Sequence, residues 1–302
     1  MPTEEKLGII IPTKDRPKDL GRVLNSISGQ DCKPERVLVV DGGSAPVRDI
    51  VDNFRGLNIE YVRVFPPSLT AQRNAGIKRI LRDVSIVIFF DDDVILEEGC
   101  LRNMKRFWES APGDVGGAGF NIVNVPPERP TILQKIFMVN SEEPGRILRS
   151  GFQSRIPFLD KTIPVQWIVG CAMAWRSSVF DEFMFDEWFS GYARYEEVDF
   201  SCRVGKKYRI FLVAAAKVRH LISLENESFS YALGKMETIN RFYFVKKNPP
   251  LSPALCVWAL FGIFLNNASK ALLVTDRRYI NRARGNLAGF ASILLNRTNS
   301  AL

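Results

Sequence analysis

Three consecutive aspartates, Asp91, Asp92 and Asp93, follow a mostly apolar run over residues 85–90. The run is short, β-branched and aromatic, which is typical of a buried parallel strand. Ligands of open α/β sheets bind beyond the carboxyl ends of such strands. Three carboxylates at that edge repel one another unless a cation neutralises them. The triplet therefore predicts a site where Mg²⁺ or Mn²⁺ holds the phosphates of a substrate, with a solvated acidic turn as the alternative.

The elements that would position this triplet alternate between strand and helix. Apolar runs predict strands over residues 7–12, 36–40, 59–64 and 85–90. Between them, one helix face is marked by Leu20, Val23, Leu24 and Ile27, and a second helix is predicted over about 69–81. Later segments predict strands over 165–170, 172–175 and 210–214 and a helix over 194–204. Repeated βα units of this length imply a parallel sheet with right-handed crossovers.

The composition is that of a globular protein: 46% of the 302 residues are hydrophobic and 25% are charged. The five cysteines are scattered without a CxxC pair, which disfavours a zinc site or a disulfide framework and favours a reducing compartment. The first residues are acidic and lead straight into a strand, so no secretory signal is expected.

The C-terminal region has a different character. Asn248-Pro249-Pro250 breaks the chain, and we expect a domain boundary there. Residues 251–269 carry no charge, and beyond them Ile280, Ala283, Leu287, Phe290 and Leu294 recur at helical spacing among arginines. From residue 251 onward six basic residues face one acid, within a net charge of +8 for the whole chain. This pattern favours in-plane association with an anionic membrane, with a true span or a cap on the protein's own core as alternatives.

Further motifs stand at the ends of predicted strands or in the helices beside them. They are Pro12-Thr-Lys-Asp-Arg-Pro17, Asp41-Gly-Gly-Ser44, Arg73-Asn74-Ala-Gly76, Gly170-Cys-Ala-Met-Ala-Trp-Arg176 and Tyr195-Glu-Glu-Val-Asp-Phe-Ser-Cys-Arg203. With the aspartate triplet as a DxD motif, their order resembles the family 2 glycosyltransferases of the GT-A fold over roughly residues 7–247. The resemblance implies an α/β fold: a GT-A-like, Rossmann-related, mostly parallel sheet flanked by helices, followed here by an amphipathic helical appendage.

The resemblance also implies roles for individual residues. A nucleotide-diphosphate sugar, with UDP or dTDP preferred, would be bound by Pro12, Thr13, Asp15, Arg16, Asp41, Gly42, Arg73, Asn74, Asp91 and Asp92. Arg73 would pair with phosphate or fix the loop carboxylates, and its alternative is a surface arginine. A divalent metal, Mg²⁺ or Mn²⁺, would be held by Asp93 and His220, the only histidine, for which a purely structural side chain is the alternative. The acceptor would contact Gly170, Trp188 and Tyr192, although aromatic side chains also simply pack.

Direct displacement needs one base to remove the proton of the acceptor hydroxyl, and it inverts the anomeric centre. The resemblance assigns this role to the ED pair at Glu196 and Glu197. The family usually has aspartate at the second position, whereas this chain has Glu197. Glu197 is the predicted base, with Glu196 and Asp199 as alternates.

The expected organisation is a glycosyltransferase domain over 1–248, with a nucleotide-sugar half over about 1–95 and an acceptor half over about 96–248, and a basic apolar region over 249–302. We expect a cytoplasmic protein at the inner face of the cell membrane that acts on a glycan or lipid-linked acceptor in cell-surface polysaccharide synthesis. An inactive nucleotide-sugar-binding or scaffold protein of the same fold is the alternative. A nicotinamide dehydrogenase is disfavoured because no GxGxxG follows the first strand, and a nucleotidyltransferase because a Gly-rich phosphate loop is missing there. Only the basic charge would favour a nucleic-acid partner, and a lipid surface accounts for that charge equally well. No nucleic acid is therefore expected as a partner.

Overall fold

The computed structural model describes residues 5–221, 227–274 and 276–297. Contacts within the chain divide it into two compact units. The first comprises residues 1–127, 156–187 and 196–222, and the second comprises 128–155, 188–195 and 223–302.

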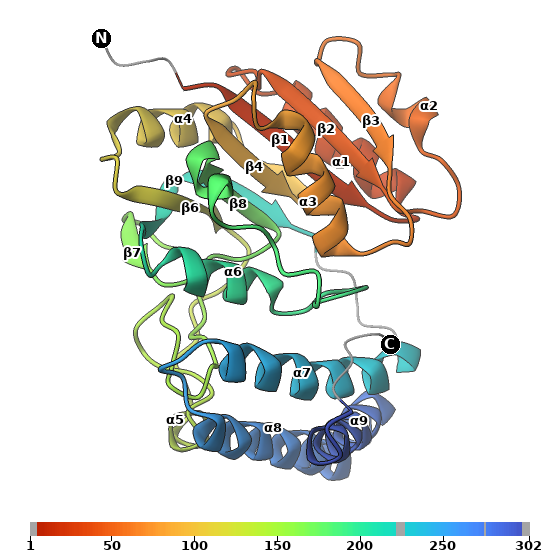
Figure 1. Ribbon diagram of the computed structural model, residues 1–302, viewed down its shortest axis with the longest axis vertical. Coiled ribbons are helices and arrows are strands. Elements are labelled where there is room, and N and C mark those ends of the chain that lie inside the picture. Colours follow the sequence, from red (N-terminus) through yellow and green to blue (C-terminus); the bar gives the residue numbers. More distant parts are fainter. Residues whose placement is uncertain (1–4, 222–226, 275, 298–302) are drawn as a thin grey trace. The chain divides into compact units, whose positions relative to one another are not determined.

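Half of the sheet in the first unit is parallel, as the sequence predicts. The order β3-β2-β1-β4 places β1 between its two parallel neighbours (Figure 1). These strands are β1 (Leu7–Thr13), β2 (Arg36–Asp41), β3 (Ile59–Arg63) and β4 (Ile86–Phe90). They alternate with α1 (Pro17–Ser28), α2 (Arg48–Val51) and α3 (Leu69–Ile80). The βα units predicted from the apolar runs are therefore present.

The other half of the nine-stranded sheet is mixed. Antiparallel β8 (Ala172–Arg176) lies between β4 and β6 (Val115–Ile122), and β6 runs parallel to β9 (Arg209–His220). Antiparallel β5 (Val94–Leu96) and β7 (Ile163–Val165) both pair with β9. The unit also contains α4 (Cys100–Ser110), the 3₁₀ helix η1 (Ser177–Asp181) and α6 (Glu196–Val204).

Two strand predictions need correction. The strand predicted over 165–170 is wrong, because β7 ends at Val165 and the next residues bend away from the ladder. The Gly170 carbonyl is not paired in a sheet ladder, and it accepts a hydrogen bond from Arg73 at 3.0 Å instead. The strand predicted over 210–214 is longer than expected, because β9 pairs with three different neighbours along its length.

The core of the first unit lies between the sheet and its helices. All four residues of the predicted α1 face are buried and belong to one apolar cluster with the side chains of β1, β2 and β4. Phe90 and Phe120 meet at this cluster with their rings 4.9 Å apart. At about 25 cal/mol per Å² of apolar surface, such burial provides the main driving force that fixes the strand ends.

The second unit is helical. It contains α5 (Ile132–Ile136), α7 (Glu227–Lys247), α8 (Pro253–Val274) and α9 (Arg277–Leu294). Glycines allow α7 and α9 to approach closely: a Cβ at Gly285 would lie 2.2 Å from the Tyr231 carbonyl oxygen. Helix α7 ends and α8 begins near the predicted boundary. Helix α7 nevertheless belongs to the same unit as the C-terminal helices, because its small residues pack against α9. The division of the contacts therefore differs from the boundary expected at residue 248.

Candidate active site

The predicted donor residues meet at the carboxyl edge of the parallel strands. Thr13 and Asp41 are register partners at the ends of β1 and β2, and Asp91 follows β4 directly. Pro12 is buried one residue earlier in β1, opposite Val40. Because parallel strands end at the same edge, chemistry-bearing residues from distant parts of the chain are brought together there.

Asp92 is held by residues that follow β1. The Thr13 hydroxyl donates to Asp92 Oδ2 at 2.7 Å, and Nη1 of Arg16 donates to Asp92 Oδ1 at 2.8 Å. The carboxylate is almost fully buried. Burial raises the pKa of Asp92 to about 7, although the bonds from Thr13 and Arg16 oppose that rise. Asp92 therefore has a structural role at the strand edge, where it fixes the segment after β1.

The two carboxylate oxygens of Asp93 face different partners, Arg16 and His220. Nη1 of Arg16 donates to Asp93 Oδ2 at 2.9 Å. The buried Asp93 Oδ1 accepts no hydrogen bond, although Nε2 of His220 lies 3.1 Å from it. The pairing of Val94 with His220 between β5 and β9 brings these two side chains together. Two ligands at right angles on a metal with bonds near 2.1 Å are about 3 Å apart, so this oxygen and nitrogen fit adjacent positions on one divalent ion.

The protein alone supplies only part of a metal site. Among the described residues, no group of three or more His, Cys, Asp or Glu side chains is arranged to hold a metal ion. Mg²⁺ and similar ions commonly take one or two protein ligands and complete their shell with phosphate oxygens and water. The pair Asp93 and His220 suits that second kind of site, in which the substrate supplies ligands.

Arg73 links the aspartate triplet to the ED pair. It extends from α3, is only 1% exposed, and forms an ion pair with Glu196 in α6. Its Nη2 lies 3.2 Å from Asp91 Oδ1 and also donates to the Gly170 carbonyl. Of the two roles considered for this arginine, fixing the carboxylates is the one that its contacts show. The surface alternative is wrong because the side chain is buried.

The three acidic residues of the ED segment have different environments. Glu196 is buried against Arg73; burial and the neighbouring Glu197 carboxylate raise the pKa of Glu196, and Arg73 opposes them. Asp199 is fully buried, and Nε of Arg203 donates to its Oδ2 at 2.8 Å. Glu197 alone of the three is partly exposed. Glu197 is therefore the only one of these three carboxylates that is accessible from solvent.

Asp41 and its neighbours form a second cluster at this edge. Asp41 is fully buried, accepts from the Tyr61 hydroxyl at 2.6 Å and from the Gly43 amide at 2.7 Å, and lies 3.6 Å from Arg63. Gly42 has no room for a side chain, since a Cβ there would lie 2.9 Å from Pro67. The role of Tyr61 was not apparent from the sequence, because an aromatic residue in a strand normally indicates packing.

Two other predicted residues organise loops. Asp15, with a positive φ of 55°, accepts from both the hydroxyl and the amide of Ser44, and these bonds lower the pKa of Asp15. Asn74 donates to the Phe185 carbonyl and to Glu187, and its own oxygen accepts from the Phe185 amide. The Asn74 side chain therefore anchors the segment over 185–187.

Comparison with known proteins identifies the family to which the chain belongs. Residues 8–183, more than half of the chain, match glycosyl transferase family 2. The chain belongs to this family. A glycosyl transfer function is therefore supported for the chain, and its fold is that of the GT-A glycosyltransferases. The match ends before the ED segment and His220, so their roles rest on the geometry above.

Solved structures agree with this fold at low sequence identity. TarS 1–349 of S. aureus is 18% identical with a TM-score of 0.54, over 97% of this chain and 82% of that one. The mannosyltransferase PcManGT of Pyrobaculum calidifontis, solved with GDP-Man and Mn2+, is 13% identical with a TM-score of 0.58, over 98% and 88% of the two chains. GalNAc-T7, solved with UDP, GalNAc and Mn2+, is 12% identical with a TM-score of 0.57, over 74% and 45%. No curated protein matches the chain.

The predicted acceptor residues of this glycosyltransferase fall in both units. Gly170, in the first unit, has little space beside it, since a Cβ there would lie 3.2 Å from Cβ of Glu197. Trp188 and Tyr192 belong to the second unit. The Trp188 ring stacks on Tyr243 with centroids 3.5 Å apart, and Tyr192 is 60% exposed with its edge against Phe229. Trp188 therefore packs within its unit, and Tyr192 presents a largely accessible ring.

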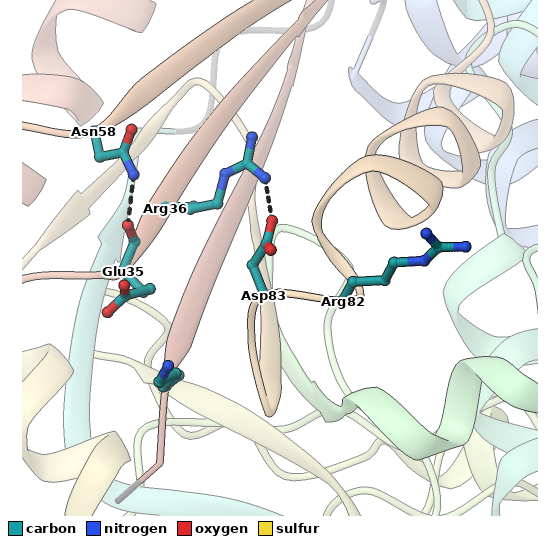
Figure 2. A pocket seen from close by; sticks show the side chains of 6 residues that line it. Glu35, Arg36, Asn58, Arg82 and Asp83 are labelled. Atoms are coloured by element: carbon teal, nitrogen blue, oxygen red, sulfur yellow. Dashed lines mark hydrogen bonds and ion pairs between the residues drawn. The ribbon is translucent and has the colours of Figure 1, made fainter.

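A surface pocket of this glycosyltransferase lies at the opposite ends of the strands. Figure 2 shows its lining, which is made of Lys6, Glu35, Arg36, Asn58, Arg82 and Asp83. Arg36 pairs with Asp83, and the Asn58 amide donates to the Glu35 carbonyl at 3.1 Å. These residues lie just before β1, β2, β3 and β4 or, for Arg36, at the first position of β2, whereas ligands of such sheets bind at the carboxyl ends. The pocket is therefore separate from the candidate active site.

Proposed function

We propose that the protein is an inverting, metal-dependent glycosyltransferase that moves a hexosyl or deoxyhexosyl group from a nucleotide-diphosphate sugar, UDP- or dTDP-linked, to a hydroxyl of a glycan or lipid-linked acceptor of cell-surface polysaccharide synthesis. The observation that carries this proposal is the chain of contacts through Arg73, which ties Asp91 at the donor edge to the ED pair. One buried cation thus fixes the distance between the expected donor and base.

Donor binding is supported by the polar residues that follow β1, β2 and β4. TarS has been solved with UDP and with UDP-GlcNAc, and PcManGT with GDP-Man. In this chain Asp41 would accept the N–H of a uracil or thymine ring, because a carboxylate offers about four acceptor sites and two are engaged. The Tyr61 hydroxyl and the Gly43 amide hold the Asp41 carboxylate in place at this edge of the sheet.

Metal binding is supported by the pair Asp93 Oδ1 and His220 Nε2. Mn²⁺ or Mg²⁺ held there would offset the negative charge that develops on the departing diphosphate. Arg16 stays on Asp93 Oδ2 and Asp92, so it neutralises the triplet without competing for the oxygen that faces His220.

The chain's own part in the reaction is to accept a proton and hold it. Glu197 takes the proton of the acceptor hydroxyl while the hydroxyl oxygen of the acceptor forms a bond to the anomeric carbon. The bond from that carbon to the diphosphate breaks, and its electron pair leaves with the diphosphate. A single displacement inverts the anomeric centre, and no second catalytic carboxylate is required, in contrast to glycoside hydrolysis. Buried Glu196 orients Arg73 and is shielded from the acceptor.

The test combines binding with turnover. Purified protein is screened by thermal shift against UDP-, dTDP-, GDP- and CMP-sugars, each with and without Mn²⁺, and a ligand at a hundredfold excess over its Kd adds about 2.7 kcal/mol of stability. Glu197→Gln should keep the metal-dependent shift and lose transfer, whereas Glu98→Gln, an exposed glutamate after β5, should keep both. Binding without transfer in the unaltered protein would instead favour the inactive scaffold, for which the glutamate at position 197 is the one sequence argument. No shift with any nucleotide sugar would refute the donor site.

A further inference from the structure

The second unit exposes large apolar side chains on one face of α8. Trp258 and Phe261 are 44% and 43% exposed, and Leu265 and Leu272 are 40% and 86% exposed. They recur at spacings of three, four and seven residues, so they form one stripe along the helix. The opposite face, with Cys256, Ala259 and Leu260, is buried. A helix at the surface of a soluble domain normally presents polar residues outward.

The short helix α5 extends this apolar face. Ile132 and Ile136 are 75% and 54% exposed. Nε1 of Trp258 donates to the Ile136 carbonyl at 2.9 Å, and the Phe137 ring lies 4.7 Å from that of Trp258. Helices α5 and α8 therefore share a continuous exposed apolar area within the second unit.

Helix α9 has large residues outside and small residues inside. Its buried residues are Ala283, Gly285, Asn286 and Gly289. The predicted apolar residues Ile280, Leu287 and Leu294 are 44%, 52% and 86% exposed instead. Exposed Arg277 and Arg284 alternate with them on the same helix face. A helix that caps the protein's own core would turn its large aliphatic residues inward.

The charged residues within these helices are all basic, and two of them, Lys135 and Arg278, pair with Glu142 and Asp276 just outside the helices. Helices α5, α8 and α9 contain no acidic residue, and their basic residues are Lys135, Lys270, Arg277, Arg278, Arg282 and Arg284. Basic side chains beside exposed Leu, Ile, Phe and Trp are the combination that binds the interface of an anionic bilayer. An ordinary protein surface has acidic and basic residues interspersed, and the basic apolar surface of these helices would not complement it as well as it complements an anionic bilayer.

We propose that the exposed faces of α5, α8 and α9 form a docking surface for an anionic lipid bilayer, on which the helices lie in the plane of the interface. Helix α8 is long and apolar enough to cross a membrane, with 22% of that stretch buried in the protein. Its inner face is nevertheless committed, because the buried Asn267 amide donates to Asn286 of α9 at 2.9 Å. If α8 spanned the membrane, this bond would break and α8 would no longer cover α9. This inference goes beyond the proposed reaction and does not depend on it.

The test uses the full chain and lipid vesicles. Co-sedimentation is measured with vesicles of phosphatidylcholine alone and with 30% phosphatidylglycerol, about the anionic fraction that gives a surface potential of tens of millivolts. We expect binding to the anionic vesicles that falls about thirtyfold in Arg277→Gln/Arg284→Gln, because each arginine near an anionic surface contributes about fivefold and the two contributions multiply. Leu287→Ser/Leu294→Ser should lower binding at least about tenfold. Arg55→Gln/Arg82→Gln, exposed arginines of the first unit, should bind as the unaltered protein does.

The outcomes separate the alternatives. Absence of binding, or an equal loss in the control variant, overturns the docking surface whatever the enzyme assay shows. Protein that resists extraction from the vesicles by alkaline carbonate overturns the in-plane arrangement in favour of a span. Self-association in sedimentation velocity that is abolished by Leu287→Ser/Leu294→Ser, without vesicle binding, assigns the surface to a second copy of the chain instead. Transfer to a soluble acceptor reports on the proposed function separately, because none of the substituted residues lies in the candidate active site.

Discussion

Replacement of Arg73 by methionine tests whether one buried cation holds the candidate site together. The guanidinium is 1% exposed and contacts Glu196, Asp91 and the Gly170 carbonyl. Methionine fills much of the volume but leaves Glu196 buried without its counter-charge. Breaking a buried ion pair by removing one partner costs about 3–5 kcal/mol. We therefore expect Arg73→Met to lower the free energy of unfolding by about that amount at pH 8.

The cost should depend on pH in a direction that the environment of Glu196 sets. Burial and Glu197 already raise the pKa of Glu196, and loss of Arg73 removes the main opposing charge. A carboxyl group whose pKa is raised in the folded state binds a proton on folding, so its contribution to stability improves as the pH falls toward that pKa and worsens as the pH rises. The penalty of Arg73→Met should therefore be smaller at pH 5 than at pH 8.

Urea unfolding followed by tryptophan fluorescence measures both effects. The matched control is Arg79→Met, on the same helix, where the arginine is about half exposed and pairs with Glu60 at 3.1 Å. An exposed pair of this kind contributes about 0–1 kcal/mol. The double variant Arg73→Met/Glu196→Gln should recover part of the loss, because it removes the uncompensated charge. The reasoning is refuted if Arg73→Met and Arg79→Met cost the same, or if Glu196→Gln makes the Arg73 variant less stable.

Three further predictions follow from single contacts. His220→Gln should abolish the Mn²⁺-dependent part of the thermal shift with a nucleotide diphosphate while the protein stays folded, because it removes one of the two protein ligands that we propose for the metal; an unchanged metal dependence contradicts the proposed pair. Gly76→Ala should destabilise the protein by about 1–3 kcal/mol in urea unfolding, because its Cβ would lie 2.7 Å from Ile10. Ser44→Ala should raise the pKa of Asp15 toward its ordinary value in an NMR titration, because the hydroxyl bond that lowers it is lost.

Two of these predictions can be sharpened, the first by a control position for Gly76→Ala and the second by the pH dependence of Asp15. Gly56→Ala should be nearly neutral, because no atom lies within 4 Å of a Cβ there. If Gly76→Ala is equally neutral, the close packing of α3 on β1 is not what fixes the position of Arg73. Since the pKa of Asp15 is lowered in the folded state, its contribution to stability is present above about pH 4 and is lost as the pH falls. A pKa of Asp15 that does not move in Ser44→Ala would assign the shift to the backbone bond alone.

The parallel half of the sheet and the α1 face could be read from the sequence because apolar runs and helical spacing report directly on burial. The neighbouring half could not, since β8 pairs between β4 and β6 through contacts that no local pattern records. The burial of Arg73 was equally hidden: an arginine in a helix normally indicates surface, and the resemblance to the family, not the local pattern, indicated that it could fix carboxylates. Glu187, the partner of Asn74, lacks any local signal for the same reason.

Helix α9 shows a second limit of periodicity. Its apolar residues recur at helical spacing, which predicts an amphipathic helix but does not say which face is buried. The structure buries the glycines and Ala283, because only small residues let α9 approach α7 closely. The close approach leaves Ile280 and Leu287 exposed. Backbone proximity, rather than side-chain hydrophobicity, therefore decided the orientation of this helix.

The three carboxylates of the aspartate triplet repel one another, and arginines of the chain itself offset most of this repulsion. Asp91 is paired with Arg73 from α3, and Asp92 shares Arg16 with one oxygen of Asp93. Two arginines thus offset the repulsion among three carboxylates without any bound ion. The other buried oxygen of Asp93 has only one partner, the ring nitrogen Nε2 of His220 at 3.1 Å. A divalent ion at this position would therefore respond to substrate phosphate more than to the triplet's charge, which is why we expect its binding to be tight only when the nucleotide diphosphate is present.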